Sequence, residues 1–545
     1  MSYLSPKLRF YNPLNNIKTW LSKQVFIQKL NNPIGYTFLS IVALGIAMVI
    51  PILGLKIGIV LLGAIFAVPV LLFCLFQHQI GLIIMVSVAF VVIPIKKVMD
   101  VPVGVLMDGL MFLMFFGMVM KQVIERDWSF AKNPISSWIL VWVFLNLIQV
   151  INPSAESKMA WLYTVRSMAG LILLYFIACY AFSSLKYIKT VFKLIIGIAL
   201  CNTLYGFYQE FIGFPQFELA WLYSDPARFE LIYQWGHLRL FSTFADPTTF
   251  GIYTVYMGMF CGILALAPLK PIKRIILGVC CVLMLWVTAY TGTRTAYVLI
   301  PAGLFFFTFM TFRREVIMIS CMGLFLGGGA MMMSTSNPII FRIQSAFKPS
   351  EDASMQLRLK NQAFIQPFIH THPMGAGLGS TGLWGQRFTP DSFLAHFAHD
   401  SGFVRVAIEL GWVGLFLYCV FLFVVMWQAI YYYYRVKDPT IKMMYLGLAN
   451  ILFLLVLANY PQEAIVQLPT SIVFYIVLAA IVRLKDFDEE PVRAYTIINK
   501  VEDSPLESDE QDNGNESYKE EDKNSYTDKI EFEIIESEEE VNTKK

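Results

Sequence analysis

The sequence predicts an all-α protein, a polytopic bundle of about fourteen transmembrane helices. Of its 545 residues 57% are hydrophobic and only 15% are charged, whereas soluble domains carry about 25% charged residues. The charges are also unevenly placed, because residues 484–545 hold 21 Asp/Glu and 8 Lys/Arg, leaving 18 Asp/Glu and 34 Lys/Arg for residues 1–483. This composition excludes a disordered chain, a nucleic-acid-binding domain and a disulfide scaffold.

Three regions follow from this distribution. Residues 1–35 form a basic cytoplasmic segment that suits either an interfacial helix or an ordinary topology-setting cap. Residues 36–483 form the membrane body, and residues 484–545 form an acidic cytoplasmic tail with the composition of disorder. No cleavable signal peptide is expected, since the first apolar run follows a basic stretch and precedes further spans.

Within the body, apolar runs of about 20 residues bounded by polar, Pro and Gly positions define the expected helices. The expected passes are residues 36–53, 57–76, 80–95, 103–120, 136–150, 166–182, 187–208, 247–267, 275–290, 296–312, 316–333, 402–430, 443–459 and 464–482. The first two are separated only by Pro51 and Gly54.

The distribution of cations predicts that both termini are cytoplasmic. With this orientation 20 of the 34 cations of the body lie in cytoplasmic loops or helix ends, and Lys96 and Lys97 are the clear exceptions. Two long segments, about 209–246 and 334–401, then face outward, and the second contains an expected amphipathic helix around residues 351–369. Long loops usually carry function, so we expect the functional site on the outer face.

The outward cations indicate a site for an anionic group. Eight of these fourteen are Arg, whose planar guanidinium suits phosphate oxygens better than an ammonium does. Arg239 precedes a turn into a helix at Pro247, and Arg294 lies among Thr and Gly between two apolar runs, where a charge is costly. The alternatives are a head-group contact for Arg239 and a boundary anchor for Arg294.

The outer segments also hold candidates for proton transfer. Histidine is the side chain best suited to take a proton from a hydroxyl near neutral pH, although most of those here are expected to be structural. Five of the six lie outward in this topology: His237, His370, His372, His396 and His399. Neither the His pairs nor the eight Cys show metal-ligand spacing, so no metal is expected. The G-x-G-x-x-G pattern at 377–382 follows no strand and does not indicate dinucleotide binding.

Three short blocks, in the order in which they occur along the chain, resemble the O-antigen ligase and polymerase superfamily of bacterial membrane glycosyltransferases. They are residues 239–251, residues 292–296 and residues 358–411, the last running through a Gly-rich turn to His399-Asp400 and a Glu-Leu-Gly sequence. The chain departs from the family pattern at two places. Where relatives often have His-Asn it has His399-Asp400, and where they often have Asn-Pro-Asn it has Asp246-Pro247-Thr248. These departures concern the subfamily and the acceptor.

The resemblance implies a GT-C-like, metal-independent enzyme without a cofactor, in the bacterial plasma membrane. It implies transfer of a glycan from an undecaprenyl-diphosphate carrier, on the outer face, to an acceptor hydroxyl on another lipid-linked glycan, on lipid A core or on a protein. Arg239 and Arg294 would bind the leaving diphosphate, and His399 would act as base on the acceptor hydroxyl. Three further residues would assist: Arg358 and Arg405 through phosphate contacts and Asp400 by orienting the histidine.

Two choices stay open at the level of sequence. A polymerase and a ligase differ in their acceptor, and acceptor contacts, sugar identity and oligomeric state cannot be read from these residues. A transporter or flippase for a lipid-linked or anionic solute is the alternative from another class, since fourteen passes and outward Arg also suit it. Such proteins usually show related halves and charges near the bilayer midplane, which are not seen in this sequence.

Overall fold

The computed structural model describes residues 74–98, 103–234, 236–332, 343–347 and 353–488, together with four isolated earlier positions. The basic segment 1–35, almost all of the first expected pass, most of the second, and the acidic tail after residue 488 lie outside the described residues.

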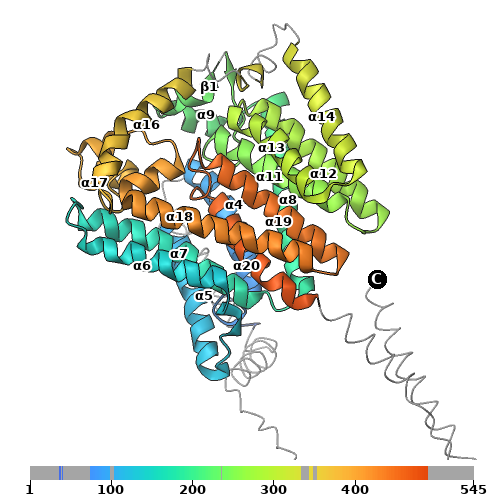
Figure 1. The fold of residues 1–545 in the computed structure, drawn as a ribbon, viewed down its shortest axis with the longest axis horizontal. Coiled ribbons are helices and arrows are strands. Elements are labelled where there is room, and N and C mark those ends of the chain that lie inside the picture. Colours follow the sequence, from blue (N-terminus) through green and yellow to red (C-terminus); the bar gives the residue numbers. More distant parts are fainter. Residues whose placement is uncertain are drawn as a thin grey trace, which may run out of the picture. The chain divides into compact units, whose positions relative to one another are not determined.

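Apart from one short hairpin, the regular secondary structure of the described residues is helical, which confirms the predicted all-α class (Figure 1). In chain order the helices are α4 (His78–Val98), α5 (Val103–Glu125), η2 (Ser129–Ala131), α6 (Pro134–Ile148), η3 (Gln149–Ile151), α7 (Lys158–Ala181), α8 (Leu185–Phe211), α9 (Gln216–Tyr223), α10 (Pro226–Ile232), α11 (Pro247–Ala265), α12 (Pro271–Tyr290), α13 (Arg294–Thr311), α14 (Arg314–Met332), α16 (Ala353–Thr371), α17 (Gly382–Phe388), η5 (Phe393–His396), α18 (Gly402–Arg435), α19 (Pro439–Ala458), α20 (Thr470–Arg483) and η6 (Leu484–Phe487). Strands β1 (Tyr233–Gln234) and β2 (His237–Leu238) pair antiparallel between α10 and α11.

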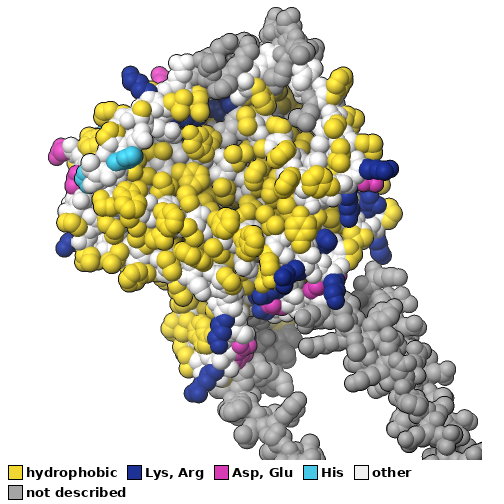
Figure 2. Space-filling view, viewed as in Figure 1, with side chains coloured by type: hydrophobic (Ala, Val, Ile, Leu, Met, Phe, Trp, Pro, Cys, Tyr) yellow, Lys and Arg dark blue, Asp and Glu magenta, His cyan; other side chains and the backbone are white. Residues whose placement is uncertain are grey.

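Among the described residues, ten helices are long and apolar enough to cross a membrane: α4 to α8, α11 to α13, α18 and α19. Figure 2 shows hydrophobic side chains over the middle of one face and charged side chains toward its edges, as expected for a surface in contact with lipid. The exposed Phe416 and Phe423 of α18 belong to such a surface. The chain is therefore a polytopic membrane protein.

The last expected pass needs a correction. It was expected at residues 464–482, but α20 begins only at Thr470, since Pro469 restricts the backbone before it. With 14 residues α20 is about 21 Å long, which is shorter than the roughly 30 Å hydrocarbon core of a bilayer. The number of fourteen passes stays a prediction.

Two helices, α11 and α19, form the centre of the bundle. Both are buried along most of their length, and they contact each other and α13. Each begins with Asp followed by Pro: the Asp246 carboxylate accepts hydrogen bonds from Thr248 N and Thr249 N at 2.8 and 2.9 Å, and Asp438 caps α19 in the same way. These caps fix where the central helices begin.

Lys97, an exception to the expected charge distribution, is explained by a buried ion pair. Its Nζ lies 3.5 Å from Glu218 Oε1 and donates to Ser242 O at 3.0 Å, and it stands over the rings of Phe241 and Trp221. The cation therefore ties α4 to the 209–246 segment. It is held by protein groups, so it carries no information on topology.

The Gly-rich turn after α16 completes a break in α18. Gly411 interrupts this helix with a φ of 69°, and a side chain there would meet the backbone of Pro373. The freed carbonyls of Ile408 and Glu409 accept hydrogen bonds from Ala376 N and Gly377 N at 2.8 and 3.0 Å. The turn thus holds the first part of α18 beside the residues that precede it.

Candidate functional site

Arg294 is the first residue of α13 and follows a tight turn that Arg239 holds in place. The Arg239 guanidinium donates to Thr291 O at 3.0 Å, to Thr293 Oγ1 at 3.2 Å and to Leu231 O at 3.3 Å. Arg239 is only 7% exposed. Its donors thus face protein acceptors, and it links the segment before α11 to the start of α13. This arrangement differs from the direct diphosphate contact that the resemblance implied.

A cationic cavity of about 240 Å³ lies beside the start of α13. Arg294 and Arg358 both line it, with Gln362 and Tyr460. None of the described residues that line it is acidic. Two guanidinium groups and the donors of a helix N-terminus favour a multiply charged anion such as a diphosphate.

Arg358 connects this cavity to His399. It lies on α16, the amphipathic helix expected around residues 351–369, and it also lines a second, smaller pocket with Asn361, His399 and Asp400. The Asp400 carboxylate lies 3.5 Å from Arg358 Nε. The structure therefore brings together two of the expected phosphate ligands and the expected base.

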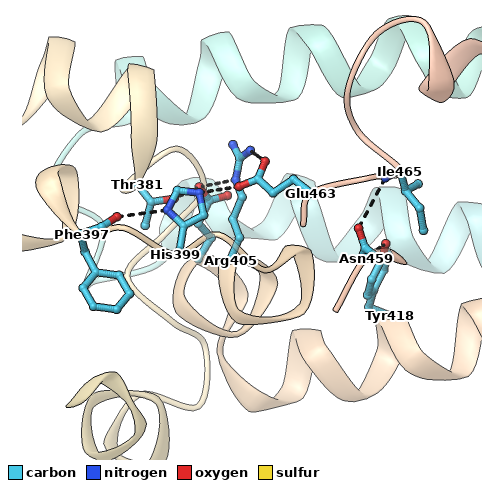
Figure 3. Close-up of polar contacts among 9 residues, drawn as sticks. Thr381, Phe397, His399, Arg405, Tyr418, Asn459, Glu463 and Ile465 are labelled. Atoms are coloured by element: carbon cyan, nitrogen blue, oxygen red, sulfur yellow. Dashed lines mark hydrogen bonds and ion pairs between the residues drawn. The ribbon is translucent and has the colours of Figure 1, made fainter. Parts of the chain in front are cut away.

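His399 is held by Glu463 (Figure 3). The His399 Nε2 lies 2.5 Å from Glu463 Oε1, and Nδ1 lies 3.2 Å from the backbone oxygen of Phe397. Because a carboxylate only accepts hydrogen bonds, Nε2 carries a proton. The expectation that Asp400 orients the histidine is thus corrected: Glu463, from the loop between α19 and α20, makes that contact.

This contact sets the charge state of both groups. Burial lowers the pKa of His399, but the hydrogen bond and charge of Glu463 outweigh it, so the pKa lies above its ordinary value. Burial alone would raise the pKa of the Glu463 carboxyl, but His399 and Arg405 hold it below its ordinary value. The pair is therefore a carboxylate with a histidine that readily holds a proton.

Arg405 stands behind Glu463 rather than in the cationic cavity. Its Nη1 lies 2.8 Å from Glu463 Oε2 and its Nε lies 3.2 Å from Glu409 Oε1. Thr381 Oγ1 donates to the same Glu409 oxygen at 2.7 Å. Two carboxylates thus face the guanidinium, and Arg405 fixes Glu463 instead of contacting the anion site.

Sequence reasoning missed Glu463, although it left a signal. Glu463 is the only acidic residue between Asp438 and Asp486, in a stretch made almost wholly of two apolar helices. A lone acid next to membrane helices is a candidate functional residue. Its partner His399 lies far away along the chain, so the pairing itself could not be read from the sequence.

The family model described as O-antigen ligase matches residues 279–419. The match contains Arg294, Arg358, His399 and Arg405 and covers two of the three sequence blocks, 292–296 and 358–411, so it confirms the resemblance; the block at 239–251 lies outside it. A comparison with curated proteins finds no match. The matched stretch ends before Glu463.

Proposed function

We propose that this chain is a multi-pass membrane glycosyltransferase of the O-antigen ligase superfamily. It transfers a glycan from an undecaprenyl-diphosphate carrier to an acceptor hydroxyl. The reaction takes place on the outer face of the bacterial plasma membrane, and the acceptor is a lipid-linked glycan, lipid A core or a protein. One observation carries the proposal: Arg358 lines both the cationic cavity of Arg294 and the pocket of His399. A diphosphate and a reacting hydroxyl would meet at this shared residue.

The cationic cavity supports the departure of the diphosphate. As the bond between the glycan's anomeric carbon and the diphosphate oxygen breaks, the electron pair stays on the diphosphate. Arg294 and Arg358 stabilise this additional negative charge through charge-assisted hydrogen bonds. Arg239 acts indirectly, since its hydrogen bonds fix the turn from which Arg294 projects.

The His399 and Glu463 pair supports activation of the acceptor. In the neutral ring the proton on Nε2 faces Glu463, and Nδ1 takes the proton of the acceptor hydroxyl once that hydroxyl has replaced the Phe397 carbonyl oxygen, which lies 3.2 Å from Nδ1. The acceptor oxygen then forms its bond to the anomeric carbon. The Glu463 carboxylate stabilises the imidazolium that results, in the way a carboxylate assists histidine in hydrolytic triads. Two Arg and one His–Glu pair thereby supply the charges for the reaction without a metal.

Substitutions in cells test the proposal. Arg294→Ala and His399→Ala should leave an inserted protein at its normal level but abolish chain growth or attachment of the surface polysaccharide. Arg228→Ala and His370→Ala are matched controls, because neither residue lines the described cavities. Normal surface glycan in both of the first two variants would refute the proposal.

The phenotype of a deletion separates the two acceptor classes. Single repeat units on lipid A core would indicate a lost polymerase, whereas long lipid-linked chains that never reach an acceptor would indicate a lost ligase. Glycan analysis of the cell envelope reads out both outcomes.

A further inference from the structure

A third cavity, the largest of the three described here at about 340 Å³, lies behind Glu463 and is not used in the proposed reaction. It is lined by α6, α7, α17, α18, α20, the Gly-rich turn after α16 and the loop between α19 and α20, and its volume lies within the roughly 300–1,000 Å³ of small-ligand sites. We infer that this cavity binds uncharged sugar residues of the glycan, apart from the diphosphate site. The inference rests on the proposed function, and it adds the part of the substrate that the cavity behind Glu463 recognises.

The lining suits a saccharide. Trp142, Trp384 and Tyr418 present large rings to the cavity, and Asn146 and Gln467 add amide groups. Aromatic rings offer flat apolar surfaces for the C–H faces of a sugar ring, while a few polar groups between them fix the orientation of a ligand. The cationic cavity beside Arg294 has a different lining, with two guanidinium groups.

The charges of the cavity exclude a phosphate and favour hydroxyl groups. Glu409 and Glu463 both line it, and Arg405 between them is already paired with both carboxylates. An anion would be repelled here, because the two acids outnumber the single cation. Sugar hydroxyls are donors as well as acceptors, so they can bind the spare lone pairs of these carboxylates.

Asn146 supplies a buried acceptor at the wall of this cavity. Asn146 is 4% exposed, its Nδ2 donates to Trp142 O at 2.6 Å, and its buried Oδ1 has no hydrogen-bond partner among the described residues. A buried acceptor without a donor is costly. In this structure the oxygen is closed off from the cavity, but when the amide group turns toward the cavity it can accept a hydrogen bond from a sugar hydroxyl, which an alkyl chain of a lipid cannot donate.

A binding experiment tests this inference with the full chain in lipid nanodiscs. Two saccharide probes are used: the oligosaccharide released by mild acid from the carrier lipid of cells that lack the protein, and the core oligosaccharide released from lipid A of the same cells. Undecaprenyl diphosphate without a glycan is the third probe. Affinities are measured at equilibrium, so the result does not depend on transfer.

Asn146→Leu should weaken binding of one oligosaccharide by about three- to tenfold, the effect of one lost hydrogen bond, and Trp384→Ala should weaken it in the same direction. Both variants should leave the affinity for undecaprenyl diphosphate unchanged, while Arg358→Gln should weaken only that ligand. Asn450→Leu is the matched control. Asn450 is also buried with an unpartnered Oδ1 and one donated bond, to Gly303 O, but it does not line this cavity.

The oligosaccharide that responds identifies whether the donor or the acceptor glycan occupies the cavity, and either result supports the inference. The inference is overturned if the wild type binds neither oligosaccharide, or if Asn146→Leu and Asn450→Leu have equal effects. It is also overturned if Asn146→Leu weakens undecaprenyl diphosphate instead. The proposed function fails on a different result, namely normal surface glycan in the Arg294→Ala and His399→Ala cells.

Discussion

Glu463→Gln should reduce transfer and change its pH dependence, because the substitution removes the charge beside His399 while keeping the size of the side chain. The 2.5 Å contact from His399 Nε2 to Glu463 Oε1 is charge-assisted, and hydrogen bonds of this kind contribute about 1.5–3 kcal/mol. If this stabilisation is realised when the imidazolium forms, its loss lowers kcat/KM by about 10- to 150-fold, at tenfold per 1.36 kcal/mol.

The pH profile distinguishes this role from a merely structural one. His399 acts as base only when neutral, and Glu463 raises the pKa of His399, so wild-type activity should rise as the pH passes upward through that raised pKa. Without the Glu463 carboxylate the pKa of His399 falls. The acid limb of kcat/KM should therefore move to lower pH in Glu463→Gln, even though the plateau is reduced.

The assay is glycan transfer by purified protein in detergent, followed from acid to alkaline pH. Glu210→Gln is a matched control: Glu210 Oε1 lies 3.4 Å from His237 Nε2, and neither residue lines the described cavities. It should keep the wild-type rate and profile. An unchanged rate and acid limb in Glu463→Gln, or an acid limb at higher pH, would refute the assigned role of this residue.

Three further substitutions test how the site is supported. Arg239→Ala should lower the thermal unfolding temperature, because three hydrogen bonds of about 0.5–1.5 kcal/mol each are lost. It should weaken undecaprenyl diphosphate binding only through the displaced turn, and unchanged stability would contradict a positioning role. Lys97→Met should lower the free energy of unfolding by about 3–5 kcal/mol, because it leaves Glu218 charged and buried. The double variant with Glu218→Leu should regain much of that free energy in denaturant unfolding, and no regain would argue against the ion pair. Gly411→Ala should prevent the break in α18, since the added carbon meets the Pro373 backbone, and faster limited proteolysis between α16 and α18 would show it; wild-type protection would argue against the tight packing.

The helices could be predicted from the sequence because their cause is local. Apolar runs bounded by Pro, Gly and charge mark each of the ten long apolar helices among the described residues, and the Asp-Pro pairs at Asp246 and Asp438 mark two starts directly. The start of α20 was placed too early because the loop before it, with Ile465 and Val466, is as apolar as a helix. This loop between α19 and α20 lies beside the cavities, and amino-acid composition does not distinguish it from a helix.

The site could be predicted only in part, because residue type and partner are separate questions. Arg294, Arg358 and His399 were named from short motifs, and the structure brings them together. Arg239 and Arg405 have the side chain that suits phosphate, but protein acceptors occupy their donors. Such pairings join segments far apart in the chain, so they become visible only in the fold.

The central claim is that the protein catalyses transfer, and purified chain in detergent tests it most directly. Given lipid-linked glycan and acceptor from cells that lack the protein, the wild type should lengthen or transfer glycan with no sealed compartment, and His399→Ala should not. A transporter or flippase could not change the glycan under these conditions. No product from the wild type in detergent, together with movement of lipid-linked glycan across sealed vesicles, would contradict the claim.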